Sequence, residues 1–178
     1  LDHKFDYCMV LHGDDQADIN DMIQFMNDSE WQSFDCILGS RFHAQSTLIN
    51  YDFKRIVGNK SLNKLISIVT GHDVTDMGSG LNLYKREYLI KKSYLAFPND
   101  LTFNVFLLLD SVYNNRKIVF IPITWRESDQ VSNAKVIKQG IEILGLLWKY
   151  IFFSKKLFKK KSPIANSQNY AYSIKYQS

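Results

Sequence analysis

The sequence predicts an α/β sandwich with a mostly parallel sheet, and three observations lead to this. Short apolar runs of strand length alternate with longer segments whose apolar residues recur at helical spacing. Polar turns follow several of the apolar runs, as at the carboxyl ends of strands in open α/β sheets, where ligands bind. The length of 178 residues suits one domain, and no apolar run approaches the ~20 residues that span a bilayer.

The predicted elements follow one another with short connections. In chain order they are a strand at 7–11, a helix at 18–27, a strand at 35–39, a polar loop at 42–50, a helix at 53–69, a strand at 79–84, a helix at 101–115, a strand at 117–121, a loop at 129–133 and a final helix at 134–153. Asp18 and Asp21 form an N-cap pattern, and Gly71 is a typical helix stop. Pro122 closes the last strand.

The charge of +4 is unevenly distributed along the chain. Residues 1–142 contain 15 Lys/Arg and 18 Asp/Glu, a balance of −3, whereas residues 143–178 contain seven Lys and no acid. Because the positive excess is confined to the C-terminal part, we expect no nucleic-acid partner for the core. Cys8 and Cys36 lie in apolar strand-like runs, which favours packed thiols over a disulfide.

Three polar side chains follow the first strand at alternate positions. His12, Asp14 and Gln16 point to one side of an extended segment. An imidazole, a carboxylate and an amide oxygen can share Mg²⁺ or Mn²⁺ with substrate phosphates, because Mg²⁺ in particular takes few protein ligands and completes its shell with phosphate oxygens and water. The alternative is a plain polar turn before the N-cap of the first helix.

Polar residues also follow later segments. Arg41 ends a Gly-Ser-Arg motif and can fork onto a pyrophosphate; a surface arginine at a strand end is the alternative. We expect Arg41 to converge with the first polar turn from an adjacent strand. Asp76 lies in a turn with Gly78 and Gly80, and it can serve as a general base or orient an acceptor. A plain turn before a strand is the alternative.

A polar loop follows the strand closed by Pro122. It contains Trp125 and the cations Arg126 and Lys135, so it can close over phosphates or a sugar. An ordinary surface loop is the alternative.

The final predicted helix has a broad apolar face and runs into a lysine cluster. The apolar residues are Ile141, Leu144, Leu147, Trp148, Ile151 and Phe152. The lysines are Lys149, Lys155, Lys156, Lys159, Lys160 and Lys161. This combination suits an anionic membrane surface, and docking on the domain's own core is the competing interpretation.

Four segments in order resemble family 2 glycosyltransferases of the GT-A fold, and especially bacterial dolichol- or polyprenyl-phosphate sugar transferases. They are Val10–Asp18, Ile37–Arg41, Asp76–Gly80 and Ile121–Arg126. The resemblance implies a GT-A-type α/β/α sandwich that lacks the usual first strand-helix-strand unit, which holds the base and ribose. The expected parts are a partial GT-A domain at 1–140, an amphipathic helix with a basic membrane-facing segment at 141–161, and a disordered tail at 162–178.

On the donor side, the resemblance implies that Asp14 and Gln16 contact the metal and the nucleotide phosphates. His12 stands where the family usually has aspartate; histidine still ligates metal and slightly favours Mn²⁺ over Mg²⁺. Arg41 matches the arginine expected near the donor phosphates.

On the acceptor side, Asp76 matches an acidic residue that acts as base or orienter. The acceptor-binding residues that the resemblance implies are Arg55, Asn59, Ser79, Arg126 and Lys135. The late loop of the family usually carries another arginine near the position of Ser128, so Arg126 and Lys135 are the cations available here.

The function expected from the sequence is metal-assisted, inverting transfer of a sugar in cell-envelope polysaccharide biosynthesis. A nucleotide-diphosphate sugar is the expected donor, and polyprenyl phosphate or a lipid-linked glycan is the expected acceptor. The expected location is cytoplasmic, peripheral at the inner face of the membrane. The alternatives are a catalytically inactive scaffold or binding module of the same fold and, from another class, a nucleotidyltransferase, against which the segments at 76–80 and 125–126 argue.

Overall fold

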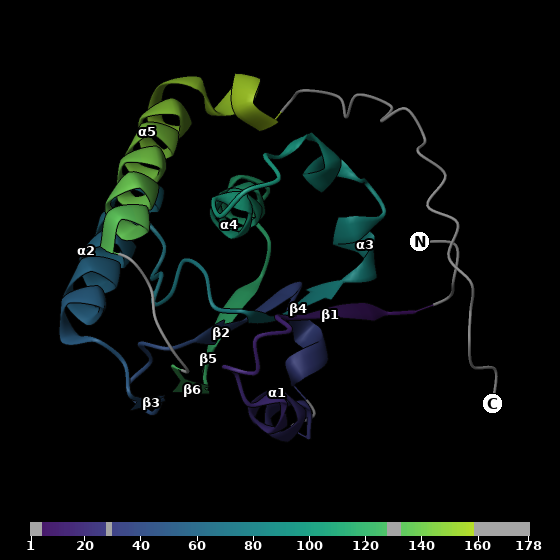
Figure 1. Cartoon of the computed structure of the whole chain (residues 1–178). Helices are drawn as coiled ribbons and strands as arrows, with labels where there is room; N and C mark the ends of the chain where they lie inside the picture. The colour runs from purple at the N-terminus through teal and green to yellow at the C-terminus, as the bar shows by residue number, and fades with distance from the viewer. Residues whose placement is uncertain (1–4, 28–29, 128–132, 159–178) are drawn as a thin grey trace, which may run out of the picture.

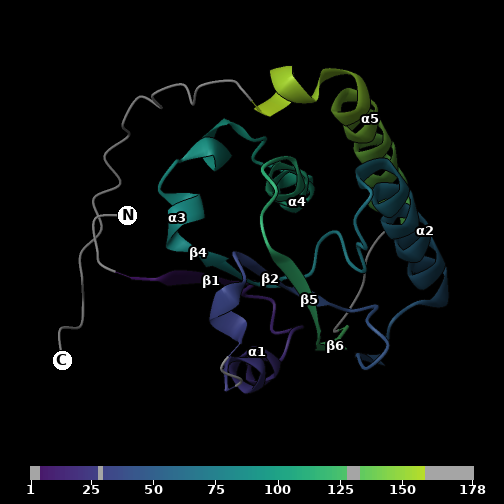
Figure 2. The same cartoon turned by 180° about the vertical axis from the view of Figure 1, so that it is seen from behind.

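The computed structural model describes residues 5–27, 30–127 and 133–158, with side chains described at all of these except 133–137. A four-stranded sheet lies between two helical layers, as Figure 1 and the reverse view in Figure 2 show. The helices on one face are α2 (Phe53–Thr70), α3 (Arg86–Leu89), α4 (Phe103–Tyr113) and α5 (Asn133–Phe158), and α1 (Ile19–Met26) covers the other face. Short 3₁₀ helices occur at Trp31–Ser33 and Ser93–Ala96. The predicted layered α/β arrangement is confirmed.

The central sheet is mixed, in the order β1-β4-β2-β5. Its strands are β1 (Tyr7–Leu11), β2 (Cys36–Ser40), β4 (Leu81–Lys85) and β5 (Ile118–Pro122). β2 and β5 pair in parallel, whereas β4 is antiparallel to both of its neighbours. β1 and β2 therefore run in the same direction but are not adjacent, which corrects the expectation that the first two polar turns leave adjacent strands.

A second sheet lies beside the central one and was not expected from the sequence. β3 (Thr47–Ile49) pairs in parallel with β6 (Thr124–Arg126). The first of these segments lies within the predicted polar loop at 42–50. Its strand conformation depends on hydrogen bonds to a segment more than 70 residues away, which the local pattern does not reveal.

Alternating residues of the central strands supply two separate apolar cores. In β2, Cys36 and Leu38 belong to the core beneath α2, α4 and α5, whereas Ile37 belongs to the core beneath α1. Successive side chains of β2 thus alternate between the two cores, as expected for a strand that is buried on both faces. Both cysteines are free thiols, as predicted.

The helix ends follow the signals in the sequence. The Asp18 side chain accepts a hydrogen bond from the backbone N–H of Asn20 and caps α1. Gly71 ends α2 in the left-handed conformation, with φ of 71°. Asp21 has a longer-range partner, because its carboxylate accepts a hydrogen bond from the backbone N–H of Thr124.

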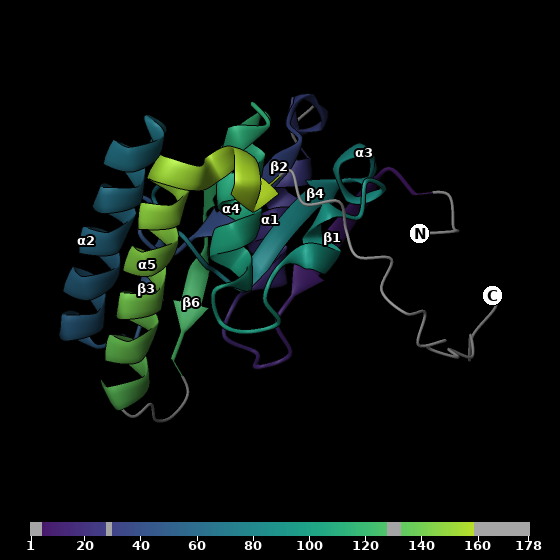
Figure 3. The same cartoon turned by 90° about the horizontal axis from the view of Figure 1, so that it is seen from above.

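α5 lies side by side with α2 (Figure 3), and it has both buried and exposed apolar residues. The residues predicted to form one broad apolar face do not share one environment, because Leu147 is buried with Ile143 and Leu146. The other members of that predicted face are exposed, together with Phe153; they are Ile141, Leu144, Trp148, Ile151 and Phe152. Within the described ranges, no helix is both long enough and apolar enough to cross a bilayer. The predicted lysines 159–161 and the tail from 162 lie outside the described residues.

Candidate functional site

The polar turn after β1 lies at the same sheet edge as the end of β2. The backbone N–H of His12 donates to the Gly80 carbonyl, 2.9 Å away, which extends the pairing of β1 with β4. A Cβ atom on Gly80 would approach the His12 ring to 2.7 Å, so glycine is required for this contact. The predicted metal turn is thus held against the segment that follows Asp76.

The carboxylate of Asp14 is exposed at the tip of this turn, and its only described contact is a long hydrogen bond, 3.4 Å, from the Gln16 backbone N–H. Asp15 adopts a positive φ of 56°, which reverses the chain. The Gln16 carbonyl accepts from the Arg126 backbone N–H, 2.8 Å away, so the turn is attached to β6. Across the described residues, no group of three His, Cys, Asp or Glu side chains forms a metal site. A metal at Asp14 would therefore need ligands from the substrate, as Mg²⁺ commonly does.

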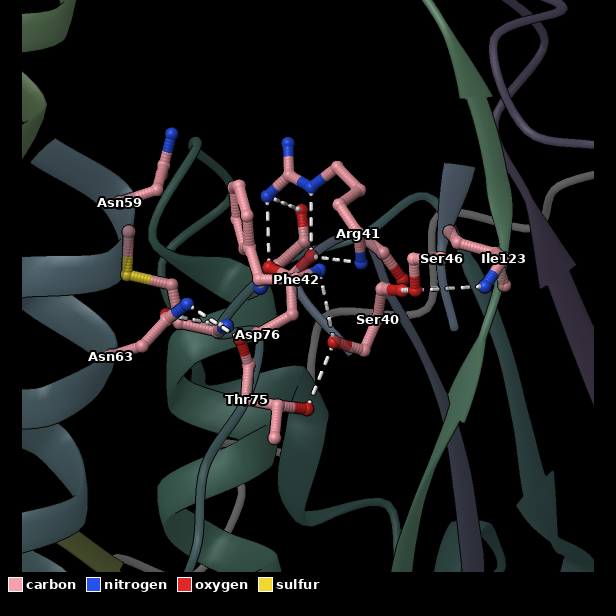
Figure 4. A network of polar contacts seen from close by, with 12 residues as sticks. Ser40, Arg41, Phe42, Ser46, Asn59, Asn63, Thr75, Asp76 and Ile123 are labelled. Atoms are coloured by element: carbon pink, nitrogen blue, oxygen red, sulfur yellow. Dashed lines mark hydrogen bonds and ion pairs between the residues drawn. The ribbon is translucent and has the colours of Figure 1, made fainter. Parts of the chain in front are cut away.

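Arg41 and Asp76 form a buried bidentate ion pair at the end of β2 (Figure 4). Arg41 Nε donates to Asp76 Oδ2 and Nη2 donates to Oδ1, each at 2.8 Å. The Asp76 side chain is fully buried and that of Arg41 is 9% exposed. Burial alone would lower the pKa of Arg41, but the charge and hydrogen bonds of Asp76 outweigh burial and raise it.

The Asp76 carboxylate accepts four hydrogen bonds in all. The backbone N–H of Arg41 donates to Oδ2 at 2.9 Å, and that of Gly78 donates to Oδ1 at 3.1 Å. A carboxylate offers about four lone-pair sites, so these contacts saturate it. In this geometry Asp76 is arranged to position Arg41 and the turn at 76–78 rather than to take a proton from a substrate.

Aromatic rings enclose the Arg41 guanidinium. Its central carbon lies 5.1 Å from the ring centre of Trp125, 5.3 Å from that of Phe42 and 5.9 Å from that of Tyr51. Nη2 also donates to the Gly78 carbonyl, and Nη1 donates to the Tyr51 hydroxyl at 3.3 Å. Of the five guanidinium N–H groups, one on Nη1 then has no hydrogen-bond acceptor among the described residues.

Tyr51 joins Arg41 to the predicted acceptor residues, and sequence reasoning missed it. Its hydroxyl accepts from Asn59 Nδ2 at 3.2 Å as well as from Arg41. The Arg55 guanidinium lies 5.0 Å from the Tyr51 ring centre. Tyr51 directly precedes Asp52, the N-cap of α2, and an aspartate just before the predicted helix at 53–69 is the signal that was available.

Arg55 and Asn59 line a hollow of about 230 Å³ between α2 and α5. The apolar side chains of Leu62, Met77 and Ile143 form much of its remaining wall. Arg55 also forms an ion pair with Glu127, a residue that sequence reasoning did not select. The hollow therefore combines a cation and an amide with an apolar wall.

The other predicted acceptor residues lie in different surroundings. Ser79 is buried, and its hydroxyl donates to the Leu81 carbonyl at 3.3 Å, so its described contacts are internal. Arg126 is exposed at the end of β6. The backbone of Lys135 begins α5, and its side chain is outside the described part.

A polar network holds the segment with Asp76 against β2 and α2 (Figure 4). Thr75 donates to the Ser40 hydroxyl at 2.8 Å. The buried side chain of Asn63 donates to the Thr75 carbonyl at 2.7 Å and accepts from the Met77 backbone N–H at 3.0 Å. Buried, satisfied networks of this kind fix geometry, so the Arg41–Asp76 pair rests on a rigid support.

Fold and site together define an α/β protein with charged side chains at the carboxyl ends of β1 and β2. No protein-family model matches the chain. The chain is similar to the polyprenol monophosphomannose synthase of Mycolicibacterium smegmatis (strain ATCC 700084 / mc(2)155), with 28% identity over 96 residues. The match covers 53% of this chain and 36% of that protein, so the chain matches about a third of the relative's length. This distant, partial similarity supports the glycosyltransferase class.

Proposed function

We propose that this chain carries the acceptor side and part of the donor side of a glycosyltransferase that moves a sugar from a nucleotide-diphosphate donor to polyprenyl phosphate. The observation that carries the proposal is the hollow between α2 and α5, where Arg55 and Asn59 adjoin an apolar wall. A prenyl phosphate has the matching chemistry, since its phosphate needs hydrogen-bond donors and its first isoprene unit needs an apolar surface. The name of the mycobacterial relative, a polyprenol monophosphomannose synthase, agrees with this acceptor class.

On the donor side, Asp14 and Gln16 would hold Mn²⁺ or Mg²⁺ together with the donor diphosphate, and His12 is a further candidate ligand. When bound, the metal would neutralise charge on the leaving diphosphate. The free N–H of Arg41 donates to a donor phosphate oxygen, and Asp76 fixes the guanidinium in place.

A phosphate acceptor suits the saturated Asp76 better than a hydroxyl acceptor does. A phosphate oxygen is already ionised at neutral pH and attacks the anomeric carbon without a base. The bond from that carbon to the diphosphate breaks, and the diphosphate leaves with the electron pair. A single in-line displacement of this kind inverts the anomeric configuration. A lipid-linked glycan, whose hydroxyl needs a base, is therefore the less favoured acceptor.

The exposed apolar residues of α5 and the exposed Lys155 and Lys156 support a peripheral position on an anionic membrane, and we assign it to the inner face. This position brings the hollow between α2 and α5 close to a lipid-borne acceptor.

The direct test is Asp14→Ala in the full-length protein, assayed for sugar transfer from a panel of nucleotide sugars to polyprenyl phosphate with Mn²⁺. We expect metal-dependent transfer to be lost, because the exposed carboxylate is the principal protein ligand proposed for the ion. Asp73→Ala removes an exposed acid elsewhere and is the matched control. Turnover by Asp14→Ala equal to that of the wild type would contradict the proposal.

The substitution of His12 for the expected aspartate favours one rival, an inactive scaffold of the same fold. Calorimetry with nucleotide sugars and Mn²⁺ separates the two. Binding by the wild type that is lost in Asp14→Ala supports the enzyme, and no binding to any donor supports the scaffold.

A further inference from the structure

A second hollow, of about 470 Å³, lies at the bend of α5, where Phe153 leaves the helical conformation. Aromatic side chains from two parts of the chain line it: Phe97 and Phe106 from the region of α4, and Trp148 and Phe153 from α5. Trp148 is 56% exposed and Phe153 is 47% exposed. Aromatic rings that border a hollow and remain this accessible are suited to an apolar ligand.

Two cations border the same hollow. Lys149 and Lys156 both line it, one from each side of the bend at Phe153. Neither lysine has an ion-pair partner among the residues that the structure covers. The one carboxylate of α5, that of Glu142, pairs with Lys138 at 3.9 Å, and no Asp or Glu follows it in the sequence. An apolar interior with two unpaired cations is complementary to an anionic amphiphile.

This hollow and the one that contains Arg55 share no lining residue. The α5 residues at the acceptor hollow are Gln139, Gly140 and Ile143. The nearest α5 residue of the second hollow is Trp148, and five residues at 1.5 Å each place it roughly 8 Å further along the helix than Ile143. A phosphate held by Lys149 and Lys156 therefore lies at a different part of α5 from the acceptor hollow.

We propose that the hollow at the bend of α5 binds one anionic membrane phospholipid, with an acyl chain among the aromatic rings and the phosphate between Lys149 and Lys156. The site holds a single lipid molecule in addition to any general attraction of the surface to a membrane. The proposal does not depend on sugar transfer, because a protein without transferase activity would bind the same lipid.

Trp148 provides the readout. The full-length protein is titrated with short-chain phosphatidylglycerol below its micelle concentration, and the fluorescence of Trp148 is followed, with Trp148→Phe identifying its contribution. We expect a saturable blue shift in the wild type. Lys149→Gln with Lys156→Gln should weaken binding by about tenfold, the loss of one or two charge-assisted contacts. Phosphatidylcholine with the same chains should bind at least about tenfold more weakly than phosphatidylglycerol.

The matched control is Lys138→Gln with Lys155→Gln, which removes two charges from the same helix at positions that do not line the hollow. Equal weakening by both pairs would show general electrostatic attraction and overturn the site. The absence of a saturable shift in the wild type, or equal binding of phosphatidylcholine, would also overturn it. Farnesyl phosphate is the last comparison, and its binding in place of phosphatidylglycerol would contradict the assigned occupant.

Discussion

Replacing Asp76 with alanine should destabilise the protein strongly, because Asp76 neutralises a guanidinium that is 9% exposed. The substitution removes two hydrogen bonds from Arg41 side-chain nitrogens, each 2.8 Å long, and leaves the backbone N–H groups of Arg41 and Gly78 without their acceptor. Removing one partner of a buried pair costs about 3–5 kcal/mol, chiefly because the remaining charge is uncompensated. Because the Arg41 side chain is almost fully buried, solvent screens its charge only weakly. We therefore expect Asp76→Ala to lower the free energy of unfolding by about 3–5 kcal/mol.

Urea denaturation followed by circular dichroism measures this loss. Asp76→Asn keeps one acceptor oxygen and should destabilise the protein less than Asp76→Ala. If Asp76→Ala does not fold, the stability of Asp76→Asn can still be measured. The double variant Arg41→Met with Asp76→Leu should be more stable than Asp76→Ala alone, because it leaves no buried charge. A cost below about 1 kcal/mol for Asp76→Ala, or a double variant no more stable than the single one, would refute the reasoning.

Three further predictions follow from buried or competing charges. Glu127→Gln should release Arg55 from its ion pair and tighten polyprenyl phosphate binding by a few-fold in calorimetry; unchanged or weaker affinity would contradict this. Burial raises the pKa of Asp110 above 3.8, so its ionised form destabilises the fold, and the free energy of unfolding falls as pH rises through the raised pKa. Asp110→Asn should therefore stabilise at pH ~8 by about 1 kcal/mol and less near pH ~4 in urea titrations; an equal effect at both would refute the assignment. Burial raises the pKa of the Cys36 thiol to about 12, so at pH ~8 a thiol reagent should label Cys8 and spare Cys36 until urea is added.

Local patterns in the sequence predicted most elements but not the way they pair. Residues 7–11 were recognisable as a strand because the apolar run stops at a polar turn, and β1 has these bounds. The direction of β4 was not predictable, because the alternation along Leu81–Lys85 is the same for either direction. β3 was missed because its hydrogen-bond partner is β6, far along the chain.

The site was predicted as a set of residues but not as a set of contacts. Arg41 and Asp76 were assigned separate roles, on the donor and acceptor sides, and they form one ion pair across 35 positions of sequence. Only the folded chain shows that Asp76 is saturated and that Tyr51 bridges Arg41 to Asn59. The local sequence could not identify Glu127 as a site residue, because its contact with Arg55 depends on the pairing of β3 with β6.

The strand β6 links the two halves of the proposed site. At one end, the backbone of Arg126 holds the turn of Asp14 through the Gln16 carbonyl. Trp125, one residue earlier, lies against the Arg41 guanidinium. Glu127, one residue later, holds Arg55. Three consecutive residues thus contact the turn of Asp14, the buried arginine and α2, so the pairing of β6 with β3 fixes the positions of all three relative to one another.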